Sequence, residues 1–119
     1  MKQNKTRKAS VAVAASIFGL SGLSGAVHAG PSGGQVVAGD ATITPGALQT
    51  LIEQLSSKAV INWDDFSIDP GELVKFIHQN SGDVTLNRVT GDTVSQIRGA
   101  LTANGNIFLI NPNGIVFGA

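Results

Sequence analysis

The stretch NGNIFLINPNGIVFG, at residues 104–118, is the most informative part of this sequence. Residues 107–110 are continuously apolar, which is typical of a strand covered on both faces, as in a buried parallel sheet. The ring of Pro112 presets φ for the second position of a type I turn, and Gly114 suits the fourth position. We therefore predict a tight corner at 111–114 between two strands.

A competing interpretation makes Asn113-Gly114 the centre of a two-residue hairpin. The strands on either side would then pair antiparallel with each other. Pro112 argues against this arrangement, because it cannot donate a ladder hydrogen bond beside a hairpin turn. We therefore favour the corner, after which the chain re-enters a strand at Ile115 as the next rung of a coiled ribbon.

Outward from this stretch, short runs of β-branched and aliphatic residues alternate with turns rich in Gly, Asn and Asp. Brief strands separated by such residues are typical of an all-β fold. The expected strands are 35–37, 59–63, 72–77, 84–87, 107–110 and 115–117.

Three of these strands have an asparagine at or next to their end, namely Asn62, Asn87 and Asn111. These asparagines are 25 and 24 residues apart. A spacing of this size fits one coil of a β-solenoid, in which each strand stacks on the equivalent strand of the next coil. The three amides could then form a hydrogen-bonded ladder. Coincidence in an asparagine-rich chain, and an ordinary antiparallel sandwich, stay open on spacing alone.

The segment 47–57 carries a different pattern. Leu48, Leu51, Ile52 and Leu55 are spaced as i, i+3, i+4 and i+7. This spacing matches the apolar face of an amphipathic helix. Local periodicity therefore predicts a helix here.

The first 29 residues have the layout of a secretory signal peptide. Residues 1–8 carry four basic side chains and no acid, residues 9–29 contain no Asp, Glu, Lys or Arg, and the segment ends in Val27-His28-Ala29. Serine and glycine dilute the apolar run, which argues against a membrane-spanning anchor. We expect a signal-peptide helix at 1–29, cleavage after Ala29, one domain at 30–119, and no stable membrane span after cleavage.

Residues 30–119 contain eight acids and four bases, a net charge of −4. This balance argues against nucleic acid as a partner, because such binding depends on Lys and Arg neutralising phosphates. The chain has no cysteine. Disulfides, thiolate metal sites and a cysteine-anchored lipoprotein are thereby excluded.

Two features could be taken for catalytic or metal sites. The acids between Asp64 and Glu72 lack the spacing of a known calcium loop, so we interpret them as a solvated turn. His78 has no second histidine or cysteine near it in a zinc-binding spacing, so we expect a surface or lightly packed residue. No nucleophile elbow or phosphate loop is present. We expect no enzyme activity, no metal and no cofactor.

Three ordered blocks resemble the secretion domain of filamentous-haemagglutinin-like two-partner-secretion exoproteins. These blocks read AVINWDDFSI at 59–68, VTLNRVTGDTVSQIRGALTANG at 84–105 and FLINPNGIVFG at 108–118. The resemblance implies the N-terminal part of a right-handed parallel β-helix with an N-terminal cap. It also implies an extended stretch at 50–54, in conflict with the helical pattern. Domains of this family are longer, so we expect this chain to be a fragment.

The resemblance further implies a partner and a cell location. The partners would be the Sec export machinery and then an outer-membrane barrel transporter with periplasmic POTRA domains. The product would be secreted or held on the surface of a Gram-negative bacterium, as part of a large adhesin or haemagglutinin-like protein. An alternative role is that of a passive structural segment of an adhesive β-helical fibre.

Residue roles follow from the same resemblance. The corner formed by Asn111, Pro112, Asn113 and Gly114 is expected to serve folding and transporter recognition. The expected structural core is Trp63, Phe66, Ile68, Leu86, Asn87, Ile97, Leu101, Ile107 and Phe108.

Overall fold

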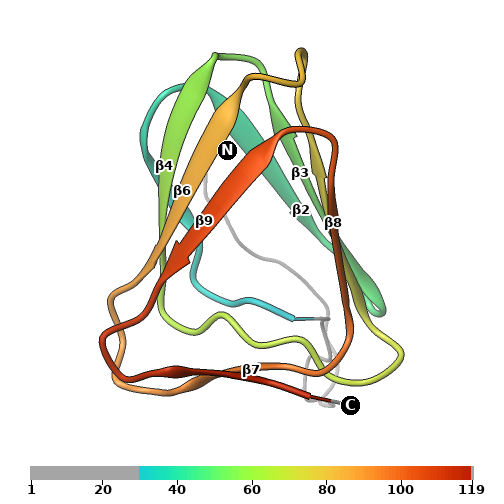
Figure 1. Ribbon diagram of the computed structural model, residues 1–119, viewed down its shortest axis with the longest axis vertical. Helices are drawn as coiled ribbons and strands as arrows, with labels where there is room; N and C mark the ends of the chain where they lie inside the picture. Colours follow the sequence, from blue (N-terminus) through green and yellow to red (C-terminus); the bar gives the residue numbers. More distant parts are fainter. Residues whose placement is uncertain (1–29, 119) are drawn as a thin grey trace, which may run out of the picture.

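The computed structural model describes residues 30–118, and these form ten strands and no helix (Figure 1). The all-β prediction is confirmed. The expected signal peptide and its cleavage site at Ala29 lie outside the described residues. The strands are β1 Gln35–Ala38, β2 Ala41–Pro45, β3 Gln49–Gln54, β4 Lys58–Trp63, β5 Leu73–Ile77, β6 Val84–Val89, β7 Ser95–Ile97, β8 Ala100–Ala103, β9 Asn106–Ile110 and β10 Ile115–Phe117.

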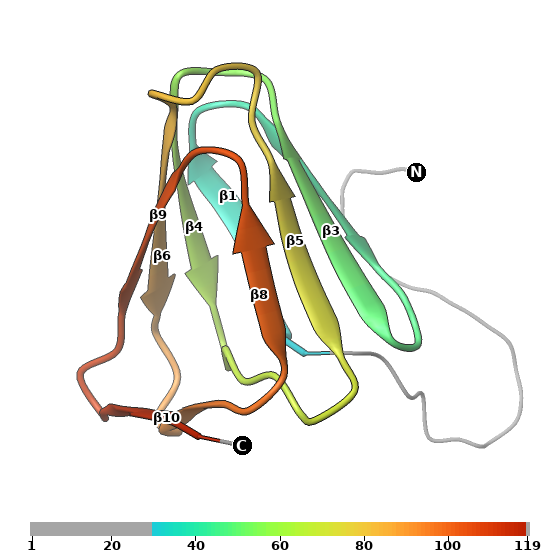
Figure 2. The same ribbon diagram turned by 45° about the vertical axis from the view of Figure 1, so that its right-hand side comes forward.

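The chain runs through the same three faces three times, and we call each circuit a pass. The first pass covers residues 49–68, the second 73–97 and the third 100–117. Strands of successive passes pair in parallel, as β3-β5-β8 on one face, β4-β6-β9 on a second and β7-β10 on the third. Figures 1 and 2 show the passes lying side by side.

The first two strands cover one end of this stack. β1 pairs antiparallel with β4 (Figure 2), and β2 pairs antiparallel with β3 (Figure 1). Without them, the strands of the first pass would present unpaired N–H and C=O groups at an open edge. At the other end, β8 and β9 each have a partner strand on one side only.

The segment 49–54 is a strand. The extended stretch expected at 50–54 is confirmed, and the helix predicted from local periodicity is wrong. β3 lies between β2 and β5, and its buried residues alternate as Thr50, Ile52 and Gln54. Leu48 and Leu55 lie outside the strand and are 67% and 62% exposed. Pairing on both sides supplies more backbone hydrogen bonds than an isolated helical turn, which explains why the tertiary context overrides the local pattern.

The predicted asparagine ladder does not form. Asn87 lies opposite Ile61 and Leu109, whereas Asn62 lies opposite Arg88. The passes differ in length on this face, since the register advances by 26 residues from β4 to β6 and by 22 from β6 to β9. A shift of one residue in register moves a side chain to the other face, so a near-constant spacing does not stack the amides.

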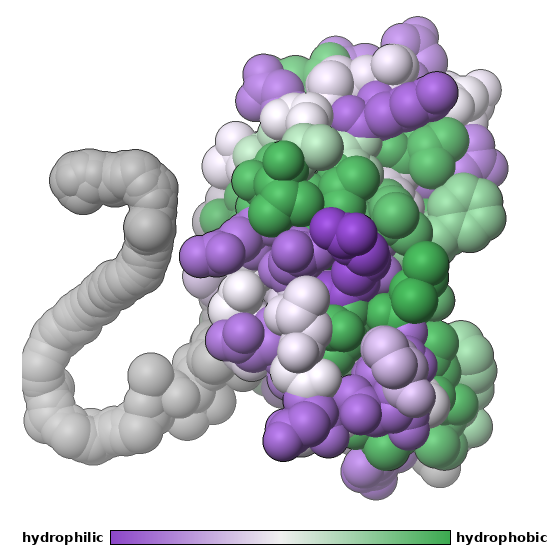
Figure 3. Space-filling model, turned by 90° about the vertical axis from the view of Figure 1, so that its left-hand side faces the viewer, coloured by the Kyte–Doolittle hydropathy of each residue, from purple (hydrophilic) through white to green (hydrophobic). Residues whose placement is uncertain are grey.

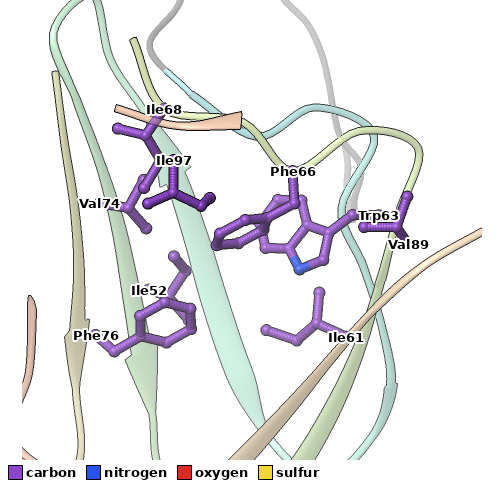
Figure 4. Close-up of a cluster of buried hydrophobic side chains, with 9 residues drawn as sticks. All are labelled: Ile52, Ile61, Trp63, Phe66, Ile68, Val74, Phe76, Val89 and Ile97. Atoms are coloured by element: carbon purple, nitrogen blue, oxygen red, sulfur yellow. The ribbon is translucent and has the colours of Figure 1, made fainter. Parts of the chain in front are cut away.

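The apolar core fills the space between the three faces (Figure 4). Trp63 and Phe66 meet edge to face, with ring centroids 5.5 Å apart. Such aromatic pairs contribute about 0.5–1.5 kcal/mol beyond the area they bury. The cluster is Ile52, Ile61, Trp63, Phe66, Ile68, Val74, Phe76, Val89 and Ile97.

Most residues expected in the core face inward, but not all of them. Trp63, Phe66, Ile68, Asn87 and Ile97 are buried, and Leu101 and Ile107 are partly buried against the cluster. Leu86 is half-buried on the outer face. Phe108 is 57% exposed, which corrects its place in the expected core and the prediction that both faces of 107–110 are covered. Side chains of a strand alternate, so Ile107 and Leu109 point inward and Phe108 points outward.

His78 is buried, with 3% of its surface exposed, contrary to the expected surface position. Its Nε2 lies 2.8 Å from the Thr85 hydroxyl, and its Nδ1 lies 3.3 Å from Asn104 Oδ1. Thr85 in turn donates to the side-chain oxygen of Gln54. The interior beyond the apolar cluster is therefore polar, and its hydrogen bonds link all three passes.

Candidate functional site

The corner between β9 and β10 is a hydrogen-bonded turn. The Gly114 N–H donates to the Asn111 carbonyl over 3.0 Å, and the Asn113 N–H donates to Asn111 Oδ1 over 2.9 Å. Gly114 has φ +115°, a value that favours glycine. β10 then pairs in parallel with β7 rather than with β9. The predicted corner is confirmed and the hairpin interpretation is wrong.

The two asparagine side chains of the corner bind the backbone of the preceding pass. Asn111 Nδ2 donates to the Thr93 carbonyl and to Ser95 Oγ, each over 2.9 Å. Asn113 Nδ2 donates to the Gly91 carbonyl over 2.9 Å. The two amides also meet each other, since Asn113 Nδ2 lies 3.0 Å from Asn111 Oδ1. The corner is thus attached to residues 91–95 by side chains as well as by the sheet.

Residues 91–95 in turn contact the first pass. Thr93 Oγ1 donates to Asp65 Oδ1 over 2.8 Å. A Cβ at Gly91 would lie 2.1 Å from the Asp64 carbonyl oxygen, so no larger residue fits without movement. Figure 1 shows the corresponding bends lying together at the base of the molecule. The corner is the third layer of a stack whose lower layers are 64–67 and 91–95.

A second chain of contacts ties the same passes together inside the core. Trp63 Nε1 donates to Asn87 Oδ1 over 2.9 Å, and Asn87 Nδ2 donates to the Phe108 carbonyl over 3.2 Å. Asn87 is 1% exposed, so its amide has these protein groups in place of water. Buried polar groups that lose such a partner cost about 1–3 kcal/mol. The Asn87 side chain therefore links β4, β6 and β9.

The structure brings together all four residues predicted at the corner, and adds partners that the sequence analysis missed. The missed partners accept hydrogen bonds from the two asparagine side chains of the corner; they are Gly91, Thr93 and Ser95. Asp65 accepts a hydrogen bond from the Thr93 hydroxyl. The sequence block at 84–105 contains three of these residues. Nothing in their spacing assigned them to the corner, because the contact depends on which passes stack.

The acidic residues between Asp64 and Glu72 hold turns. Glu72 Oε1 accepts from the backbone N–H groups of Gly30 and Asp69, each over 3.0 Å. Within residues 30–118, no group of His, Cys, Asp and Glu is arranged to hold a metal ion. The same residues include no helix long and apolar enough to cross a membrane.

Comparison with known proteins agrees with this architecture. The model of the TPS secretion domain family matches residues 27–119. Among solved structures, the chain is similar to the crystal structure of the HMW1 secretion domain from Haemophilus influenzae, with a TM-score of 0.70 and 44% identity. That match covers 75% of this chain and 24% of the solved chain.

Two curated relatives are heme/hemopexin-binding proteins of Haemophilus influenzae. One, from strain Rd, is 40% identical over 86 residues, covering 72% of this chain and 10% of the relative. The other is 41% identical over 106 residues, covering 85% of this chain and 11% of the relative. This chain thus spans about a tenth of the length of these relatives. On the family match and these likenesses, the chain belongs to the TPS secretion domain family of two-partner-secretion exoproteins.

Proposed function

We propose that residues 30–119 form the first passes of a right-handed parallel β-helix that an outer-membrane transporter recognises. Three passes pairing in parallel on three faces, with antiparallel strands over the first pass, support this architecture. A chain of this family serves as the secretion-targeting module of its exoprotein. The partner we propose is a barrel transporter with periplasmic POTRA domains.

Export to the periplasm would come first. The basic, uncharged and small-residue regions of 1–29 fit a signal peptide that the Sec machinery reads and that is cleaved after Ala29. The parent protein would then be secreted or displayed on a Gram-negative cell. The segment shared with the heme/hemopexin-binding proteins is the secretion domain, so this likeness supports common export rather than a common ligand.

The proposed role of the corner rests on its attachment to the second pass. Asn111 and Asn113 donate to carbonyl groups at 91–93, so these bonds form only after the second pass is in place. Each bond contributes about 0.5–1.5 kcal/mol. Pro112 and Gly114 set the turn between the two amides. We infer that the corner attaches the third pass to the second as the third pass emerges, which couples folding to transport.

Secretion of a full-length parent tests this proposal. Asn111→Ala and Asn113→Ala are expected to lower the secreted amount and leave product in the periplasm, measured by immunoblotting of the two fractions. Asn80→Ala is the matched control, because Asn80 is an exposed asparagine that serves its turn through its backbone. Equal secretion of all three variants and the parent would sink the proposal.

A binding experiment separates this function from that of a passive fibre segment. The chain is expected to bind the purified periplasmic domains of the partner transporter, measured by calorimetry. Cell adhesion without such binding would instead identify a structural segment of an adhesive fibre.

A further inference from the structure

The outer face of the β1-β4-β6-β9 sheet carries a continuous row of apolar side chains. The register aligns one outward residue from each strand, and three of the four are larger than alanine. The apolar row is Ala38, Val60, Leu86 and Phe108. Figure 3 shows the side of the molecule that carries this sheet, crossed by a hydrophobic band above hydrophilic side chains.

The neighbouring sheet provides an internal comparison. Its β2-β3-β5-β8 strands stack in the same way, and their outer residues include threonine and lysine. The aligned row there is Thr44, Leu51, Lys75 and Thr102. A solvent-facing sheet surface normally alternates in this way, with polar side chains outward. The apolar row is therefore a property of one face and not of the architecture.

A further pass stacked on β9 would not cover this row. A new strand pairs at the edge of a sheet, in the plane of its hydrogen bonds, whereas Phe108 and Ile110 project from the face. These two side chains are 57% and 51% exposed. Val60 and Leu86, which continue the row, are half-buried. A group that covers Phe108 and Ile110 would therefore lie on the face, and exposed apolar side chains that adjoin one another in this way mark an interaction site.

The charges around the row indicate what lies on it. None of the four strands contains an acidic residue, although residues 30–119 hold eight. Lys58 precedes Val60 by two residues and Arg88 follows Leu86 by two, so one cation lies on each side of the row. Arg88 donates to Asn62 Oδ1 over 3.0 Å, a neutral partner. The face is basic on a chain that is acidic elsewhere.

Geometry selects a helix as the occupant. A strand laid flat on a sheet face would bury backbone groups without partners, whereas a helix satisfies its own. Four strands about 4.8 Å apart give a row about 14 Å long, which matches about ten helical residues at 1.5 Å each. Carboxylates on both sides of an apolar helical stripe would face Lys58 and Arg88.

We propose that the outer face of the β1-β4-β6-β9 sheet is a docking surface for an amphipathic helix of a partner protein, with acidic residues flanking its apolar stripe. This surface is distinct from the corner at 111–114, and the proposal does not depend on the transporter. A second copy of this face would bring like charge and no helix, and nucleic acid offers no apolar stripe to cover the row.

Two labelled synthetic 14-residue peptides test the proposal by fluorescence anisotropy with the chain at low salt. Both carry the same leucine stripe, flanked by glutamate in one and by lysine in the other. We expect the glutamate peptide to bind at least about tenfold more tightly, since opposite charges attract and like charges repel across the interface. Lys58→Glu combined with Arg88→Glu should reverse that order.

Apolar contact is tested by removing the two exposed apolar side chains of β9, which are Phe108 in the row and Ile110 beside it. Phe108→Ser with Ile110→Ser should weaken the glutamate peptide by at least about tenfold, because buried aromatic anchors dominate such interfaces. Phe117→Ser is the matched control, since Phe117 is 73% exposed in β10, outside this sheet, and its loss should leave binding unchanged. Urea midpoints equal to that of the parent establish that the variants fold.

Three results would overturn the proposal. The first is equal binding of the two peptides, and the second is binding of the glutamate peptide that the Phe108 and Ile110 substitutions leave unchanged. The third is binding to phosphatidylglycerol vesicles that depends on Phe108 while the glutamate peptide does not bind, which would assign the face to a membrane.

Discussion

Single residues set how closely the three passes approach one another. At Gly91 the chain lies against the Asp64 carbonyl of the first pass, while its own carbonyl accepts a hydrogen bond from Asn113 of the third. One glycine therefore lies between two layers of the stack. Glycine is required here for lack of space and not for a positive φ, since no positive φ occurs at this position.

We predict that Gly91→Ala destabilises the fold by about 1–3 kcal/mol, the usual cost of overpacking, because the new Cβ would meet backbone that cannot rotate away. Gly82→Ala is the control, because nothing lies within 4 Å of the position that its methyl group would take and its φ is not positive. That change should be neutral or stabilising by about 0.4–1 kcal/mol. Urea unfolding followed by tryptophan fluorescence measures both, and equal effects would contradict the layered packing.

At the scale of the element, β3 shows how pairing decides between two periodicities. The leucine and isoleucine spacing of 48–55 would give a helix one apolar face, and the strand instead buries Thr50, Ile52 and Gln54. Gln54 belongs inside because its Nε2 donates to the Ser56 and Val84 carbonyls, over 2.9 and 3.0 Å. A pattern of hydrophobic residues cannot predict a buried glutamine whose side chain binds the backbone at a bend.

A strand and a helix at 48–55 predict different losses of stability for the same substitutions. In the strand, Ile52→Ala should destabilise by about 2–5 kcal/mol, as for a fully buried aliphatic side chain. Leu48→Ala and Leu55→Ala should each change stability by no more than about 0.5 kcal/mol, because both are exposed. A helix would make all three costly. Thermal or urea unfolding of the three variants distinguishes the outcomes.

At the scale of the whole molecule, the two ends of the stack differ. β1 and β2 cover the first pass with antiparallel strands, whereas β8 and β9 are paired on one side only. The last pass is also less buried, with Ile107, Leu109 and Ile115 only partly covered. Stability should therefore fall from the capped end toward the third pass.

Amide hydrogen exchange of the chain checks this gradient. Backbone N–H groups of β5 and β6 are expected to exchange at least about tenfold more slowly than those of β8 and β9, because edge strands open locally with less loss of packing. Mass spectrometry of peptic fragments resolves the two groups. Uniform protection across the three passes would show instead a single cooperative unit.

Much of this protein could be read from its sequence because local chemistry dictated it. Short β-rich runs between turn residues located the strands at 59–63, 84–87 and 107–110, and Pro112 excluded the hairpin because it has no N–H to pair. The same 111–114 motif, with the two blocks before it, indicated the family. These features depend on neighbouring residues alone.

Only the tertiary structure determined which residues lie opposite one another on neighbouring strands. The passes are unequal in length, so their register, and with it the face of Asn87, Asn62 and Phe108, follows from how whole strands pair. The burial of His78 and the contacts of the corner with Gly91 follow in the same way. Successive side chains of a strand point to opposite faces, so the register of pairing determines which groups meet in the interior and which face a partner. No local sequence pattern specifies that register.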